Sequence, residues 1–291
     1  MKGALGALLA AALAAAGCAR SPESASDVPR ADCGKGPGFE YCLYSPPAGA
    51  GHDTRTLLYH LHGNNESHLN WGGWFAAKAY YRSFRERGIP APTVATVSYG
   101  KLWLLTEAGP GPADGLLEHF VSEAMPFIEE RAGKPERRLL WGMSMGGFNA
   151  AQLLLKHPSL WDSVVLSCPA ITSLPPDADQ SEIDAFIART GADPDRVKWI
   201  LEQSGRQFPS PERWRRHDPL SIAPRSGPLP PTFIECGDRD EYGFFEGARR
   251  LSEELSSAGQ PVRFKRTAGA GHCAVTPGPI LSFLQEAASG G

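Results

Sequence analysis

Short apolar, β-branched runs alternate along the chain with longer segments in which apolar residues recur at helical spacing. The short runs predict strands at residues 56–60, 93–98, 138–142, 163–167, 232–236 and 262–266. The longer segments predict helices at residues 74–87, 116–131, 146–157 and 244–258. This alternation predicts an α/β fold with a mostly parallel central sheet flanked by helices on both faces. A weaker strand pattern at residues 39–45 predicts an antiparallel edge strand before the parallel run.

One long segment, at about residues 171–230, interrupts the alternation before the next predicted strand. Loops of this length usually have structure or a function of their own. The segment contains a helical pattern at residues 181–190, followed by aromatic and basic side chains, namely Trp199, Phe208, Trp214, Arg215, Arg216 and His217. We expect a lid-like insertion after the sixth strand; an elaborated crossover with exposed arginines is the alternative.

The N-terminus has the pattern of an export signal. Residues 3–17 contain only Gly, Ala and Leu behind Lys2, and this run is too short to span a bilayer stably. It ends in small residues followed by Cys18, which resembles the bacterial lipoprotein signal. We therefore expect a signal peptide at 1–17, a lipidated Cys18, a flexible tether at 18–35 and an α/β domain at 36–291. The alternative is an ordinary secretory signal, and both place the protein outside the cytoplasm, in the bacterial cell envelope or secreted.

Composition adds two exclusions and one expectation. The chain has 29 Lys and Arg against 32 Asp and Glu, a formal charge of −3, and no run of five like charges. Nucleic acid is therefore excluded as an expected partner, and membrane association is expected only through the lipid anchor. Export favours disulfides, and Cys33 and Cys42 bracket a Gly-rich turn, so they are the expected pair. At most two of Cys168, Cys236 and Cys273 can pair, and the sequence does not show which two.

The string Gly142-Met143-Ser144-Met145-Gly146 fits the pattern G-x-S-x-G. It lies between a predicted strand and a predicted helix, which is the context that a serine nucleophile in a sharp strand-to-helix turn requires. The amide of Met145, directly after the serine, is the expected donor to a developing oxyanion.

A serine nucleophile needs a base, and the base needs a carboxylate to orient it. His272 lies in a glycine-rich loop after the last predicted strand, and Asp238 and Asp240 follow the strand before it. The order Ser, Asp, His along the chain is that of α/β-hydrolases.

With these motifs the chain resembles the putative-esterase branch of the α/β-hydrolase superfamily, which includes esterase D, feruloyl esterases and mycolyltransferases. The resemblance covers about residues 57–283. Its most specific marks are Leu61-His62-Gly63-Asn64, Gly142-Met143-Ser144-Met145-Gly146-Gly147, His157-Pro158 with Trp161 and Ser167, Gly237-x-x-Asp240, and Gly271-His272.

The resemblance implies roles for particular residues. It selects Asp240 as the acid of the triad, with Asp238 as the first alternative and Glu241 or Glu246 as remote ones. It also implies Asn64 as the second oxyanion donor, with Asn65 as the alternative. No organic cofactor and no metal are implied, because the pair His60 and His62 lacks the Asp and His that a two-metal hydrolase would add.

Several other side chains are candidates for substrate binding. His62, Trp71, Trp74 and Tyr242 lie near the expected site, although aromatic residues at the start of a helix are more often part of the core. We expect an exported serine esterase that cleaves small-molecule or polysaccharide-linked carboxylic esters. The alternatives are an acyltransferase with an alcohol or sugar acceptor and a non-catalytic binding protein on a hydrolase fold.

Overall fold

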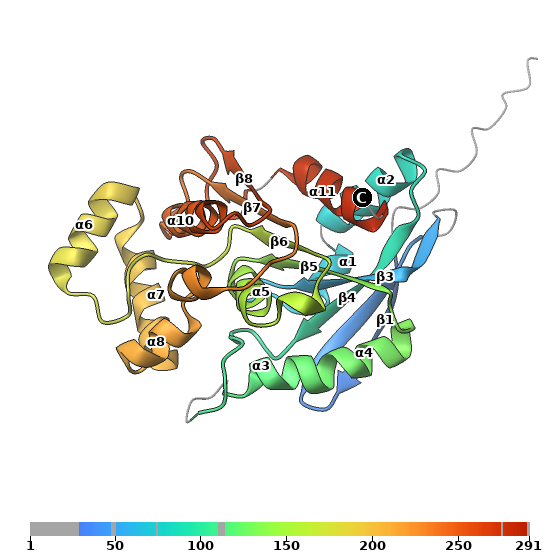
Figure 1. The fold of residues 1–291 in the computed structure, drawn as a ribbon, viewed down its shortest axis with the longest axis horizontal. Helices are drawn as coiled ribbons and strands as arrows, with labels where there is room; N and C mark the ends of the chain where they lie inside the picture. Colours follow the sequence, from blue (N-terminus) through green and yellow to red (C-terminus); the bar gives the residue numbers. More distant parts are fainter. Residues whose placement is uncertain (1–28, 48–50, 74, 110–113, 275, 290–291) are drawn as a thin grey trace, which may run out of the picture.

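The computed structural model describes residues 29–47, 51–73, 75–109, 114–274 and 276–289. At its centre is an eight-stranded sheet with the order β1-β2-β4-β3-β5-β6-β7-β8 (Figure 1). The strands are β1 (Arg30–Gly36), β2 (Phe39–Ser45), β3 (His52–Leu61), β4 (Ala91–Ser98), β5 (Arg137–Met143), β6 (Ser163–Ser167), β7 (Thr232–Gly237) and β8 (Val262–Thr267). Strands β3 to β8 pair in parallel, and β1 and β2 are antiparallel to their neighbours. The predicted mostly parallel sheet is confirmed.

Helices cover both faces of this sheet (Figure 1). One face is packed against α1 (Asn70–Gly73), α2 (Phe75–Glu86) and α11 (Pro277–Ser289). The other face is packed against α3 (Leu116–His119), the π-helical turn η1 (Phe120–Ala124), α4 (Met125–Ala132), α5 (Met145–Lys156) and α10 (Phe244–Ser257). A short 3-10 turn, η2 (Pro158–Leu160), leads from α5 toward β6.

The period-two geometry of the strands sorts their side chains between the two faces. In β3, Leu57, Tyr59 and Leu61 enter the core beneath α3 to α5, whereas Leu58 enters the core beneath α2 and α11. Trp141 of β5 joins Leu58 in that second core. Because both faces are buried, the strands read as nearly continuous apolar runs, as the sequence shows.

The long insertion between β6 and β7 is helical. It contains α6 (Gln180–Thr190), α7 (Pro194–Gln207), α8 (Pro211–His217), α9 (Pro219–Ile222) and the 3-10 turn η3 (Ala223–Arg225). A capping box between Asp179 and Glu182 begins α6, and Gly191 in the left-handed conformation ends it. Figure 1 shows α6 and α7 projecting beyond the layers that cover the sheet, and a small core of their own stabilises them.

Two expectations about the N-terminal region require correction. The strand predicted at the edge, β2, has β1 on its outer side, because Cys33 of β1 lies opposite Cys42 of β2 and the two are disulfide-bonded. Residues 30–35 therefore belong to a strand and not to the expected tether, since backbone pairing fixes them to β2. The expected signal peptide and Cys18 lie outside the described residues. No helix of the described segments has the length and apolar character needed to cross a membrane.

Candidate active site

Ser144 occupies the sharp turn between β5 and α5. Its backbone angles are φ 53° and ψ −116°, a conformation that non-glycine residues rarely adopt and that costs free energy. Hydrogen bonds hold it there: the Ser144 amide donates to Ser167 O at 3.0 Å, and its carbonyl accepts from Phe148 N at 3.0 Å and Ala170 N at 2.9 Å. The turn therefore presents the serine hydroxyl at the carboxyl edge of the sheet.

The two glycines that flank Ser144 allow β5, α5 and β3 to approach one another. A Cβ atom on Gly142 would lie 2.1 Å from the carbonyl oxygen of Gly146. A Cβ atom on Gly146 would lie 2.0 Å from the carbonyl oxygen of Leu61. Both distances are far below contact, so the glycines of the G-x-S-x-G pattern are required by packing.

Ser144, His272 and Asp240 form one continuous chain of contacts. The Ser144 Oγ lies 2.9 Å from His272 Nε2, and His272 Nδ1 lies 2.6 Å from Asp240 Oδ2. The Asp240 side chain is 0% exposed, and its other oxygen accepts the amide of Tyr242 at 2.9 Å. The sequence-predicted serine, histidine and first-choice aspartate are thus brought together in the order that nucleophilic catalysis requires.

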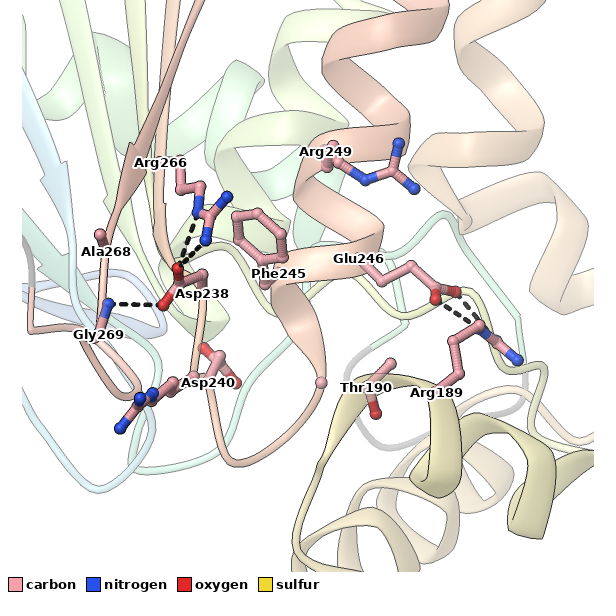
Figure 2. A pocket seen from close by; sticks show the side chains of 12 residues that line it. Arg189, Thr190, Asp238, Asp240, Phe245, Glu246, Arg249, Arg266, Ala268 and Gly269 are labelled. Carbon is pink, nitrogen blue, oxygen red and sulfur yellow. Dashed lines mark hydrogen bonds and ion pairs between the residues drawn. The ribbon is translucent and has the colours of Figure 1, made fainter.

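The alternative acids have other partners. Asp238 forms an ion pair with Arg266 at 2.6 Å and accepts the amide of Gly269 at 2.7 Å (Figure 2). The hydrogen bond from Arg266 holds the pKa of Asp238 below its ordinary value. Glu246 pairs with Arg189 on the far side of the surface cavity drawn in Figure 2, which Asp238 also lines. Neither carboxylate orients His272.

Acidic side chains also fix the backbone of the loop that carries His272. Asp238 holds Gly269, Glu241 accepts the amide of His272 at 2.7 Å, and Glu235 accepts the amide of Thr276 at 3.0 Å. We call residues 268–276 the histidine loop; residue 275 is outside the described segments. Three carboxylates close to Asp240 in the sequence therefore position the loop that holds its partner.

The cysteine pairing that the sequence left open is resolved in the structure. Cys168 and Cys273 form a disulfide, and Cys236 is a free, buried thiol whose pKa is raised by burial. Cys273 follows His272 directly, and Cys168 follows β6 beside the Ser144 turn. Cys168, His272 and Cys273 are close enough to hold a metal ion, but the disulfide leaves the two sulfur atoms without the thiolate form that a metal requires.

The expected oxyanion donors lie beside the serine. Met145 and Asn64 line the same pocket as Ser144. The amide of Asn65, the alternative donor, is already given to the carbonyl oxygen of Lys101 at 3.0 Å. The geometry therefore favours Asn64 as the second donor.

Two expected substrate-binding residues belong to the interior instead, which corrects the expectation. Trp71 is 0% exposed and packs against His60, Tyr80 and Trp141, because the start of the helical region faces the sheet. His62 is buried and its Nε2 lies 3.0 Å from Trp103 Nε1.

Burial lowers the pKa of His62 to about 4, so it remains neutral at physiological pH. Its Nδ1 lies 2.7 Å from the carbonyl oxygen of Gly63. His62 thus supports the loop that carries Asn64 and does not face a substrate. Trp74 lies outside the described residues.

Tyr242, the fourth expected binding residue, does line the pocket at Ser144. Its ring lies 4.8 Å from that of His272 in an edge-to-face contact and stacks on Phe244. The insertion also supplies side chains to this pocket. Trp199, Phe208 and Trp214 belong to the aromatic stretch of the expected lid-like insertion, whereas sequence reasoning missed Ile200, Gln203 and Ser204 of α7. The aromatic side chains beside them are the signal that could have found them.

The parallel sheet, the strained serine turn and the Ser–His–Asp arrangement define the protein class as an α/β-hydrolase. The family model for Esterase, described as "Putative esterase", matches residues 41–278, and the chain belongs to that family of carboxylic ester hydrolases. No curated protein matches the sequence.

Solved structures share the fold at low sequence identity. A brefeldin A esterase, a bacterial homologue of human hormone-sensitive lipase, has 18% identity and a TM-score of 0.62, covering 92% of this chain and 80% of its own. An S-formylglutathione hydrolase from Agrobacterium tumefaciens has 17% identity and a TM-score of 0.60, covering 89% and 94%. An esterase/lipase from an uncultured bacterium has 16% identity and a TM-score of 0.63, covering 91% and 87%.

Proposed function

We propose that this protein is an exported serine esterase that hydrolyses small carboxylic esters through an acyl-enzyme. Ser144 Oγ attacks the ester carbonyl while His272 Nε2 accepts its proton, and Asp240 holds the imidazole in the required tautomer. His272 then gives the proton to the leaving alcohol. Water attacks the acyl-Ser144 ester with His272 again as the base, which releases the acid and restores the serine.

The observation that carries this proposal is the unbroken chain from Ser144 Oγ to His272 and on to the buried Asp240. The amides of Met145 and Asn64 are the proposed donors to the carbonyl oxygen as it becomes negative, and the presence of both residues in the lining of the pocket at Ser144 supports that role. The N-terminus of α5 adds partial positive charge at the same place.

The direct test replaces the nucleophile. Ser144→Ala should lower kcat on p-nitrophenyl acetate by about 10⁴-fold or more, because no other group forms the acyl-enzyme. Ser122→Ala, at an exposed serine of η1 whose hydroxyl donates to the carbonyl oxygen of Glu118, is the control and should retain full activity. Full activity of the Ser144→Ala protein, with an unchanged circular dichroism spectrum, would overturn the proposal.

Export through a signal at residues 1–17, with lipid attachment at Cys18, is part of the proposal. The two disulfides support it, since such bonds persist mainly in oxidising compartments. In a bacterial host the full chain should partition with membranes, and Cys18→Ser should move it to the soluble fraction. A full chain that stays soluble in the cytoplasm with its N-terminus uncut would contradict this part.

A further inference from the structure

The pocket beside Ser144 is closed on one side by helix α7 of the insertion. We call it the α7 pocket; its lining includes Ser144 and Met145 of the serine turn and Trp199, Ile200 and Gln203 of α7. Phe208 and Trp214 also line it, in edge-to-face contact at 5.2 Å. None of the described residues that line the α7 pocket carries a charge.

The position of the α7 pocket relative to Ser144 and His272 indicates whether it binds the acyl half or the alcohol half of an ester. In the tetrahedral intermediate the carbon carries Ser144 Oγ, the oxyanion, the leaving oxygen and the acyl chain. The oxyanion faces the amides of Met145 and Asn64, and the leaving oxygen must face His272 Nε2 to receive its proton. His272 does not line the α7 pocket, whereas both oxyanion residues do. The remaining substituent, the acyl chain, is the one that points into it.

The chemistry of the walls selects an uncharged chain. A carboxylate or ammonium on the acyl group would lose its hydration among Phe208, Trp214 and Ile200 with no counter-ion to replace it, which is strongly unfavourable. Arg196 of α7 is bound to the hydroxyl of Tyr242, a residue of the pocket lining, at 2.6 Å and lies over its ring. Arg196 therefore holds Tyr242 against α7 and does not serve as a counter-ion in the pocket.

The size of the pocket limits the length of the chain. Its volume is about 80 Å³, far below the roughly 300–1,000 Å³ of pockets that enclose drug-sized ligands. Phe148 and Phe208 both line it, with ring centroids 6.2 Å apart. Trp199 of α7 is the largest side chain that this helix contributes to the lining, and its ring centroid lies 6.5 Å from that of Tyr242.

From these observations we propose that the α7 pocket binds the acyl half of the ester and restricts it to short, uncharged chains, with Trp199 as the side chain that sets the length limit. This inference rests on the proposed esterase function. It assigns the long insertion a direct part in substrate selection.

The first test is a series of p-nitrophenyl esters with acetyl, butyryl and octanoyl chains. We expect kcat/KM to fall by at least about tenfold from butyrate to octanoate, the range that a badly fitting apolar group costs in a hydrophobic pocket. Trp199→Ala should raise the octanoate-to-butyrate ratio by about tenfold. Lys198→Ala, an exposed neighbour on the same helix, should leave that ratio unchanged.

A second comparison tests the exclusion of charge. The p-nitrophenyl monoester of succinic acid resembles the butyrate ester but ends in a carboxylate. It should react at least about a hundredfold more slowly, and Gln203→Arg should recover part of that loss by supplying a counter-ion. Faster turnover of octanoate than of butyrate, or equal turnover of the charged and uncharged esters, would overturn the pocket assignment.

The outcomes separate the two proposals. If the esters react and Ser144→Ala abolishes the reaction, the serine mechanism stands, and only the chain-length and charge profiles decide the role of the α7 pocket. If no ester reacts and Ser144 is not labelled by a fluorophosphonate probe, the esterase function fails and the acyl assignment fails with it.

Discussion

Cys168 and Cys273 are bonded to each other across 105 residues of sequence, and the bond fastens the histidine loop to the segment that brackets the Ser144 turn. Cys273 adjoins the base, and its Sγ lies 3.4 Å from His272 Nε2. Ala170, two residues after Cys168, donates its amide to the carbonyl of Ser144. The nucleophile and the base, which are far apart in the sequence, are thus held at a fixed separation by a covalent link as well as by hydrogen bonds.

Removing this disulfide should impair both activity and stability. We expect the double variant Cys168→Ser with Cys273→Ser to lose about tenfold in kcat/KM, since a small displacement of the base is costly. In the chain-entropy description, closing so long a loop contributes about 5 kcal/mol to the free energy of unfolding. Ester hydrolysis and urea denaturation of the purified double variant measure both effects.

The other disulfide provides the matched control. Cys33→Ser with Cys42→Ser opens a link of only nine residues at the β1–β2 edge, far from Ser144 in the sheet order. It should lower stability by about 3 kcal/mol and leave kcat/KM intact. Equal loss of activity in the two double variants would show that the Cys168–Cys273 link does not act through the geometry of the site.

The two neighbouring aspartates should respond differently to the same substitution. Asp240→Asn should lower kcat by about 10⁴-fold, because the amide no longer selects the tautomer of His272 that can accept the serine proton. Asp238→Asn keeps an oxygen for the Gly269 amide and loses only the exposed pair with Arg266, so its effect should stay below about tenfold. Steady-state kinetics of both variants would reveal a misassignment if Asp238→Asn were the more damaging.

Acid should destabilise the fold through two buried histidines, His60 in β3 and His62 directly after that strand. Burial lowers the pKa of His60 to about 3 and that of His62 to about 4, whereas in the unfolded chain both have the ordinary value near 6.5. Below about pH 6.5 these histidines therefore become protonated in the unfolded state but stay neutral in the folded state. The free energy of unfolding should fall by up to about 1.4 kcal/mol per pH unit for each histidine.

Urea denaturation between about pH 7 and about pH 5 measures this dependence. His62→Gln should reduce the pH slope by about the share of one histidine. An unchanged slope in that variant would contradict the assignment of a neutral, buried His62.

Two glycine-to-alanine substitutions should change the free energy of unfolding in opposite directions. Gly146→Ala should cost several kcal/mol and remove activity, because the new methyl group would collide with the Leu61 carbonyl. Gly205→Ala, in α7 with nothing within 4 Å of the added methyl, should stabilise the protein by about 1 kcal/mol. Thermal melting compares them, and destabilisation by Gly205→Ala would contradict the open space at that position.

The sheet and the Ser144 turn were predictable because local signals agree there. Buried strands appear as apolar runs, and the glycines around Ser144 form a short motif that is recognised in the sequence itself, although Gly146 is required by the distant Leu61 carbonyl of β3. Asp240 could be preferred over Asp238 only by family resemblance, since both follow the same strand. The two differ in their tertiary contacts: Asp240 is buried against His272, whereas Asp238 is paired with Arg266.

Other features depend on partners that are distant in the sequence. Trp71 is of a residue type that often binds substrates, but it packs against Tyr80 and Trp141, and these contacts place it in the core. The pairing of Cys168 with Cys273 depends on how β6 and the histidine loop converge. Strand β1 escaped prediction because its alternation is weak and its disulfide to Cys42 supplies what apolar burial does not.

The histidine loop is held by carboxylates that contact its backbone amides, and this has a consequence for how its sequence can vary. Glu235, Asp238 and Glu241 contact main-chain atoms that every residue except proline presents. Substitutions at Ala268 or Ala274 leave those contacts in place, whereas loss of the side-chain oxygen at Glu235, Asp238 or Glu241 breaks them. In a library of variants, positions 268 and 274 should therefore accept diverse side chains, while positions 235, 238 and 241 should keep residues with a side-chain oxygen.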